Sequence, residues 1–149
     1  MRSAPDGNLV IAKLDDGEDL LGSLNLIVKE NRIDSGTVLW GIGMVRGFEV
    51  GYFDGKAYRK KTFGPPHELL ALHGSIAARA DPVFHLHLAA GNEAHGVVGG
   101  HLFRATVSTL NEICIARFAS VHLSRELSPR SGLRELALEP ARAGAGSST

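Results

Sequence analysis

The amino-acid sequence predicts an α+β domain with a mainly antiparallel β-sheet. One stretch, which begins at Asp19, has apolar residues at helical spacing. Seven or more stretches have the branched and aromatic residues typical of strands, and turn signals such as Asp54-Gly55 and Gly64-Pro65-Pro66 separate them. One helix among that many closely spaced strands is typical of an α+β fold.

The first predicted elements are a strand and the helix. The strand spans residues 9–14 and ends at Asp15-Asp16-Gly17. The apolar residues of the helix share one face, which must pack on a sheet: Leu20, Leu21, Leu24, Ile27 and Val28. Acidic Glu18 and Asp19 stand at its start and basic Lys29 and Arg32 at its other end, which is the charge order that the helix dipole favours.

The rest of the chain is predicted to form strands and turns. The strands are expected at residues 37–42, 47–53, 56–63, 68–76, 83–90, 97–107 and 112–119, with a last strand pair within 123–138. Asp81-Pro82 and residues 91–96 are predicted turns. Gly41, Gly43 and Gly47 do not match a dinucleotide-binding fingerprint, and we expect them to permit bends or close packing.

Length and composition indicate one globular domain. The chain has 149 residues, of which 44% are hydrophobic and 21% charged, as is usual for globular proteins. We expect a single domain over residues 1–140 and a disordered tail over 141–149, where small residues dominate. No apolar stretch resembles a signal peptide or a membrane span, so a cytoplasmic location is expected. The single cysteine, Cys114, lies in an apolar run and is predicted to be a core thiol.

The charge balance bears on nucleic-acid binding. Sixteen basic and sixteen acidic residues give a formal net charge of zero, whereas proteins that bind nucleic acid through phosphates usually carry a basic excess. One local basic cluster is a candidate phosphate contact: Lys56, Arg59, Lys60 and Lys61. The alternative is a solvated edge strand whose charges prevent aggregation.

A group of histidines is the main candidate site. His85 and His87 stand two residues apart in the predicted strand 83–90, so their side chains share one face, while Phe84, Leu86 and Leu88 face the core. Two imidazoles on one sheet face, with Cα atoms roughly 6.5–7 Å apart, can converge on one ion. His101 follows Gly99-Gly100 on the next predicted strand, and the two glycines would leave room for such a site.

The register between two strands decides whether His101 joins the other two histidines. If His87 stands opposite His101, all three imidazoles lie on one face, and we favour this register. A slip of one residue would pair Leu86 with His101 and turn His101 to the other face.

Three imidazoles suit Zn²⁺ or another divalent first-row ion, with a fourth position open to water or a further ligand. The alternative is that His85, His87 and His101 are hydrogen-bonded or surface imidazoles without a metal. His73, on strand 68–76, is a candidate fourth ligand. We expect three other histidines to be solvated: His67, His95 and His122.

With these residues in place, the sequence resembles the plants-and-prokaryotes conserved domain, the PPC family, over roughly residues 8 to 140. The matching segments are Gly41-Ile-Gly-Met-Val45, Phe48-Glu-Val-Gly-Tyr-Phe53, Glu68-Leu-Leu-Ala-Leu-His-Gly-Ser-Ile-Ala77, His85-Leu-His87, Gly99-Gly-His-Leu102 and Ala105-Thr-Val107. The resemblance implies an antiparallel sheet that wraps a helix, and a homotrimer. It also implies a metal site, present in some prokaryotic members, at positions that match His85, His87 and His101.

The function that the resemblance attaches to the family is DNA binding. In plants the domain follows AT-hook segments, short Arg-Gly-Arg-Pro-like motifs, and this sequence contains none. Three functions therefore stay open. The first is a trimeric, metal-containing, regulatory or DNA-associated module without catalysis, and the second is a metal that only ties strands or subunits together.

The third is a zinc-dependent hydrolase or lyase. It needs a general base, for which Glu68 and Glu112 are the candidate carboxylates, although both fit equally well as surface residues.

Overall fold

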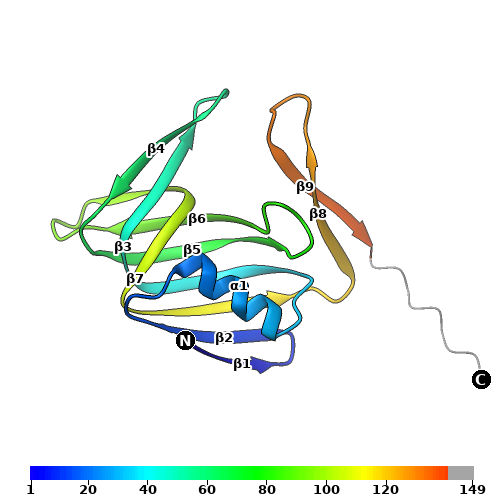
Figure 1. Cartoon of the computed structure of the whole chain (residues 1–149), viewed down its shortest axis with the longest axis horizontal. Helices are drawn as coiled ribbons and strands as arrows, with labels where there is room; N and C mark the ends of the chain where they lie inside the picture. Colours follow the sequence, from blue (N-terminus) through cyan, green and yellow to red (C-terminus); the bar gives the residue numbers. More distant parts are fainter. Residues whose placement is uncertain (141–149) are drawn as a thin grey trace, which may run out of the picture.

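The computed structural model describes residues 1–140 and confirms the predicted α+β class. It contains one helix and nine strands, and every strand pairing in this part of the chain is antiparallel (Figure 1). The elements are β1 (Arg2–Asp6), β2 (Leu9–Asp15), α1 (Leu20–Glu30), β3 (Ser35–Phe53), β4 (Tyr58–Phe63), β5 (His67–Ala77), β6 (Phe84–Gly91), β7 (Val97–Arg117), β8 (Val121–Leu127) and β9 (Arg134–Pro140).

Seven strands form the main sheet, in the order β1-β2-β7-β6-β5-β3-β4. Strand β3 also pairs with β7, so β3, β5, β6 and β7 form a closed ring of strands. Strands β1 and β4 are the outer strands on the two sides. The remaining two strands, β8 and β9, form a separate hairpin that projects from the sheet on the same side as the β3–β4 hairpin (Figure 1).

Helix α1 closes one side of the core, as its apolar spacing predicts. Asp19 is the N-cap, and its Oδ1 accepts a hydrogen bond from the Gly22 N–H at 2.6 Å. Leu20, Leu24 and Ile27 are completely buried. They belong to one hydrophobic cluster with residues of β2, β3, β5, β6 and β7, so the helix and the ring of strands share a single core.

The two longest strands differ from the prediction. Residues 37–42 and 47–53 belong to one strand, β3, and residues 97–107 and 112–119 fall largely within one strand, β7. Register shifts interrupt the β3–β7 pairing at several points without ending either strand. Gly43 and Gly47 have φ values of 127° and 56°, and Thr109 has a φ of 64°. The sequence breaks at these points are therefore bends within continuous strands.

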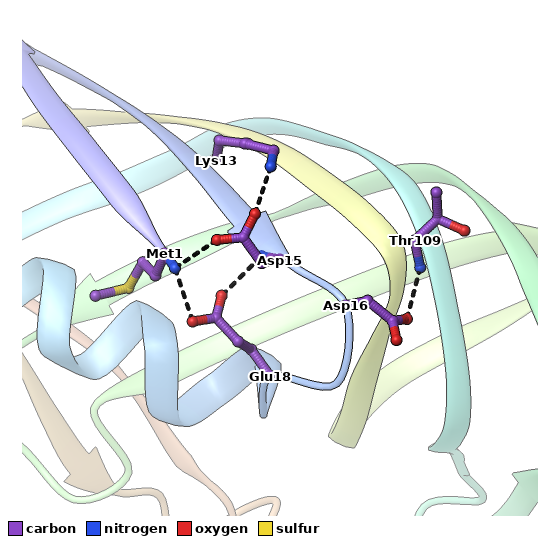
Figure 2. Close-up of polar contacts among 6 residues, drawn as sticks. All are labelled: Met1, Lys13, Asp15, Asp16, Glu18 and Thr109. Carbon is purple, nitrogen blue, oxygen red and sulfur yellow. Dashed lines mark hydrogen bonds and ion pairs between the residues drawn. The ribbon is translucent and has the colours of Figure 1, made fainter.

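A polar cluster connects the start of the helix to the bend of β7. The Met1 amino group lies 2.8 Å from carboxylate oxygens of Asp15 and Glu18, and Asp16 Oδ1 accepts a hydrogen bond from the Thr109 N–H at 2.8 Å (Figure 2). Lys13 also pairs with Asp15. The hydrogen bond with Lys13, followed by the one with the Met1 amino group, lowers the pKa of Asp15 to about 2. The cluster holds the β2–α1 turn against β7.

Several smaller expectations have clear outcomes. Strand β1 was not predicted, because Pro5 and the polar residues of this segment hide its strand character. The last strand pair is confirmed as β8 and β9, and Cys114 is confirmed as a buried thiol. The predicted disordered tail, 141–149, lies outside the described residues. No helix within residues 1–140 is long and apolar enough to cross a membrane.

Candidate metal centre

The three candidate histidines meet on one face of the ring of strands. Strands β6 and β7 pair with His87 directly opposite His101, so the predicted register is confirmed. His85 stands two residues before His87 on the same strand and shares its face. The strand order brings the histidines together because β6 and β7 are neighbours in the sheet.

The distances among the three imidazoles suit a single ion. The Nε2 atoms of His85 and His87 are 3.2 Å apart, and one ring nitrogen from each of the three histidines lies within 4.8 Å of the others. Two nitrogens bound to one tetrahedral zinc ion are separated by ~3.3 Å, since each Zn–N bond measures about 2.0–2.1 Å. The pair His85 and His87 already has this spacing, and His101 needs only a small side-chain movement to reach it.

The surroundings keep these imidazoles neutral. Burial, followed by the nearby His85, His87 and Lys60, lowers the pKa of His101 to about 4. Burial is also the main cause that lowers the pKa values of His85 and His87. Both side chains retain solvent-exposed surface, yet the protein around them excludes enough water to disfavour the charged form. Neutral imidazoles keep the lone pairs that a metal requires.

Aromatic side chains orient His101. The Tyr58 ring, on β4, packs against the His101 ring with centroids 4.8 Å apart, and Phe103 does the same at 4.8 Å. The Tyr58 hydroxyl lies 3.5 Å from Nδ1 of His101, at the limit of a hydrogen bond. This contact leaves Nε2 of His101 available for an ion.

A pocket of about 290 Å³ opens beside the histidines. Its wall combines residues of the sheet with residues of both projecting hairpins: Tyr58, Pro82, Phe84, His85, His101, Phe103, Arg125, Gly132, Leu133 and Arg134. In Figure 1 the β3–β4 and β8–β9 hairpins rise on either side of the strands that carry these histidines. An ion held by the three imidazoles would therefore be accessible to a small ligand.

Arg125, on β8, is the most unusual residue of this wall. Its side chain is 7% exposed, Nε donates to the Pro82 carbonyl at 3.3 Å, and Nη2 donates to Ser75 Oγ at 3.0 Å. Nη1 is buried and has no hydrogen-bond partner among residues 1–140. Burial lowers the pKa of the Arg125 guanidinium, whose charge in turn contributes to the low pKa of His85. Nothing in the local sequence around Arg125 had indicated a place in the site.

The glycines next to the histidines have a different role from the predicted one. A Cβ atom on Gly99 would lie 2.4 Å from the Leu88 carbonyl oxygen, and one on Gly100 would lie 2.7 Å from the Gly51 carbonyl oxygen. These glycines therefore allow neighbouring strands to approach His101 closely, instead of clearing space for its imidazole.

The other histidines lie outside the three-histidine group. His73 pairs with His87 across β5 and β6 but is exposed and does not belong to the group. The prediction that His67 is solvated is wrong, because it is 7% exposed, packs on Phe48 and contacts the Pro65 carbonyl through Nδ1 at 2.9 Å.

Two further histidines lie at turns or strand ends. His122 is half-buried, and its Nδ1 lies 2.8 Å from Asp34, which also contradicts a solvated position. His95 is exposed in a turn, as expected.

The predicted DNA contact lies on the β3–β4 hairpin: Lys56, Arg59, Lys60 and Lys61. Two of these charges are paired. Arg59 Nε is 2.9 Å from Asp54, and Lys60 Nζ is 3.4 Å from Glu49. Lys56 lies in the turn and Lys61 on β4, and neither forms an ion pair with any residue among 1–140. Neighbouring residues of β4 also alternate between its two faces, so the four do not form one continuous surface.

The candidate general bases do not reach the pocket. Glu68 and Glu112 are both exposed, and Glu112 lies beside Trp40 on the outer face of the sheet. Within residues 1–140, no aspartate or glutamate lines the pocket beside the histidines. Neither carboxylate is therefore placed to act on a ligand there.

Comparisons with known proteins agree with the fold. The profile of the Plants and Prokaryotes Conserved (PCC) domain, the family also abbreviated PPC, matches residues 1–119. A comparison with curated proteins found no match.

Three solved structures are similar over most of the chain. A candidate DNA-binding protein from Bacteroides thetaiotaomicron has 27% identity and a TM-score of 0.83, covering 91% of this chain and 96% of its own. A metal-containing protein from Archaeoglobus fulgidus has 30% identity and a TM-score of 0.79, and the match covers 88% of this chain and 94% of that protein. A plant- and prokaryote-conserved protein from Pyrococcus horikoshii has 28% identity and a TM-score of 0.77, and the match covers 87% of this chain and 92% of that protein.

Proposed function

Because the chain belongs to the Plants and Prokaryotes Conserved domain family, we propose that it is a metal-binding module whose ion is held by His85, His87 and His101. The observation that carries the proposal is the grouping of three ring nitrogens within 4.8 Å. Neutral nitrogen ligands in this number favour Zn²⁺ or another divalent first-row ion. The similar protein from Archaeoglobus fulgidus, described as metal-containing, supports the same proposal.

The pocket favours an ion that binds a ligand over an ion that is only structural. Structural zinc sites are usually closed by four protein ligands, whereas three ligands leave one position for water or another molecule. Here two of the three histidines line a pocket. We propose a regulatory or ligand-binding role without catalysis. A zinc-dependent hydrolase or lyase is the alternative, and it would have to act without a carboxylate from the described pocket wall.

Metal content tests the proposal directly. We expect purified protein to contain about one zinc or similar ion per chain by elemental analysis, and we expect His85→Ala and His87→Ala to lose it. His95→Ala is the matched control, because His95 is an exposed histidine outside the group. Absence of metal from the wild type after incubation with zinc, or equal metal in all variants, would overturn the proposal.

The proposed assembly is a homotrimer, supported by apolar side chains on the outer face of the sheet. Ile11 of β2 and Trp40 of β3 flank Cys114 of β7, and both are more than two-fifths exposed. Such a patch is typical of a surface that another subunit covers. Light scattering after gel filtration should give three times the chain mass. Trp40→Asp should lower the measured mass, whereas Tyr52→Asp, on the projecting β3–β4 hairpin, should leave it unchanged. A monomeric wild type would contradict the trimer.

DNA contact is a second candidate function. The similar Bacteroides protein is described as a candidate DNA-binding protein, and Lys56 and Lys61 lack ion-pair partners within residues 1–140. Three copies would add their attraction for phosphates. Fluorescence anisotropy with a labelled duplex at low salt should show binding that weakens with salt and with the double variant Lys56→Ala/Lys61→Ala. No binding at low salt, or no effect of the variant, would exclude this candidate.

A further inference from the structure

We propose that the pocket beside the three histidines binds a small organic carboxylate whose charge lies between Arg125 and the metal ion. The inference goes beyond metal binding, and it rests on the proposed ion for one of its two contacts. It begins from Arg125, a buried cation for which the described chain supplies no anion.

The contacts of Arg125 are all neutral. Its Nε and Nη2 donate to the Pro82 carbonyl, the Ser75 carbonyl and the Ser75 hydroxyl, at 3.3, 3.4 and 3.0 Å. These groups hold the guanidinium in place but carry no charge. No carboxylate among residues 1–140 forms an ion pair with it, although it is 7% exposed. A buried charge without a counter-charge is costly, and an anion in the adjoining pocket would reduce that cost.

The three histidines would leave a bound metal ion with a positive charge that an anion could balance. Three neutral imidazoles add no negative charge, so a divalent ion bound to them keeps its full positive charge. Arg134, a second cation, also lines the pocket, and no acidic residue of the described chain does so. Both charged residues of the described pocket wall, Arg125 and Arg134, are therefore cations, which favours anions over neutral or cationic ligands.

Size and lining define the rest of the ligand. The pocket holds about 290 Å³, the lower end of the range for small-molecule sites. Tyr58, Phe84, Phe103 and Leu133 supply aromatic and aliphatic surface around the charged groups. This combination fits a carboxylate attached to a compact apolar or aromatic body, and it fits a highly polar anion such as inorganic phosphate less well.

Isothermal titration calorimetry with benzoate and with benzamide tests the inference, because benzamide has nearly the same shape as benzoate but no charge. We expect zinc-loaded protein to bind benzoate at least about tenfold more tightly than benzamide. Arg125→Gln should weaken benzoate binding roughly tenfold to a hundredfold, as expected for loss of a charge-assisted contact, with little effect on benzamide. Arg130→Gln is the matched control, because Arg130 is an exposed arginine of the same hairpin outside the pocket wall.

A second variant keeps the test decisive if Arg125→Gln does not fold. Leu133→Trp adds bulk to the pocket wall without changing a charge, and it should weaken benzoate and benzamide alike. Equal affinity of the wild type for the two compounds, equal effects of Arg125→Gln and Arg130→Gln, or binding of inorganic phosphate without benzoate would overturn the inference.

Metal analysis separates this inference from the proposed function. Arg125→Gln should keep the zinc content of the wild type. If neither the wild type nor any variant binds zinc, the proposed metal-binding function is wrong. Benzoate binding by the EDTA-treated wild type that is lost in Arg125→Gln would then still support the anion pocket. If zinc binds and benzoate binding does not depend on Arg125, the pocket inference fails alone.

Discussion

Replacement of Gly74 by alanine should damage both the fold and the metal site. Gly74 lies on β5 with a φ of 145°, and a Cβ atom there would be 2.0 Å from the His85 carbonyl oxygen. Gly47 is the matched control: it also has a positive φ, 56°, but its Cβ would have nothing within 4 Å. The control shows what an alanine costs at a positive φ where no neighbour has to move, whereas Gly74→Ala adds a rarer backbone conformation and the displacement of β6.

The expected magnitudes differ between the two variants. A positive φ costs an alanine roughly 1–2 kcal/mol at position 47, which lies in the left-handed helical region, and roughly 1–3 kcal/mol at position 74, where a φ of 145° is one that L side chains rarely adopt. Overlap with a backbone that must move adds roughly 1–3 kcal/mol for Gly74→Ala alone. For a protein of this size, 1 kcal/mol corresponds to about 2–4 °C in Tm. Gly47→Ala should therefore lower Tm by about 2–8 °C, and Gly74→Ala by about 4–24 °C.

The assay is thermal unfolding followed by circular dichroism, together with zinc content. Because the atom that Gly74→Ala displaces belongs to His85, this variant should also lose zinc affinity, whereas Gly47→Ala should keep it. Equal changes in Tm for the two variants, or wild-type zinc affinity in a destabilised Gly74→Ala, would refute the link between this strand contact and the site.

Three further predictions concern single side chains. In metal-free protein, NMR titration of His101 should give a pKa of about 4. The stability that its neutral form contributes should be fully present above pH ~6.5 and should be lost as the pH falls toward 4. A measured pKa near 6.5 would contradict the effect of its half-buried position. Asp16→Ala removes the acceptor of the Thr109 N–H and should cost about 1–2 kcal/mol with faster hydrogen exchange at Thr109; unchanged exchange would contradict the role of this contact. Asn111→Ala should lower the free energy of unfolding in urea by about 1–3 kcal/mol, because this completely buried side chain donates to the Met44 carbonyl at 2.9 Å. The control variant Glu112→Ala, at an exposed neighbour, should change it by no more than about 0.5 kcal/mol. Equal losses in the two variants would exclude the explanation.

Local spacing was enough to predict the helix and the register of the histidines. The helix has an apolar face because Leu24 and Ile27 must enter the core, and Asp19 marks its start. The pairing of His87 with His101 follows from the alternation of side chains, since a slip of one residue would have turned His101 to the core face of the sheet, where Leu86 is 1% exposed. Each of these features depends on residues close together in the sequence.

Features that depend on distant residues were missed. Gly43 and Gly47 look like strand ends, and only the pairing of β3 with β7 shows that the strand continues through them. Arg125 stands two residues after buried Leu123 on β8 and shares its face, which is a signal for an inward side chain. Its lack of an acidic partner cannot be read from the sequence, because its contacts, Ser75 and Pro82, lie 50 and 43 residues away.

The β8–β9 hairpin begins just after residue 119, where the match to the family profile ends. The three histidines lie inside the matched region, while Arg125, Leu133 and the rest of the hairpin wall lie outside it. Substitutions in the hairpin can therefore change which molecule enters the pocket while the residues proposed to hold the ion stay the same. A chimera that carries another member's hairpin should take over that member's ligand preference and keep the metal affinity of this chain.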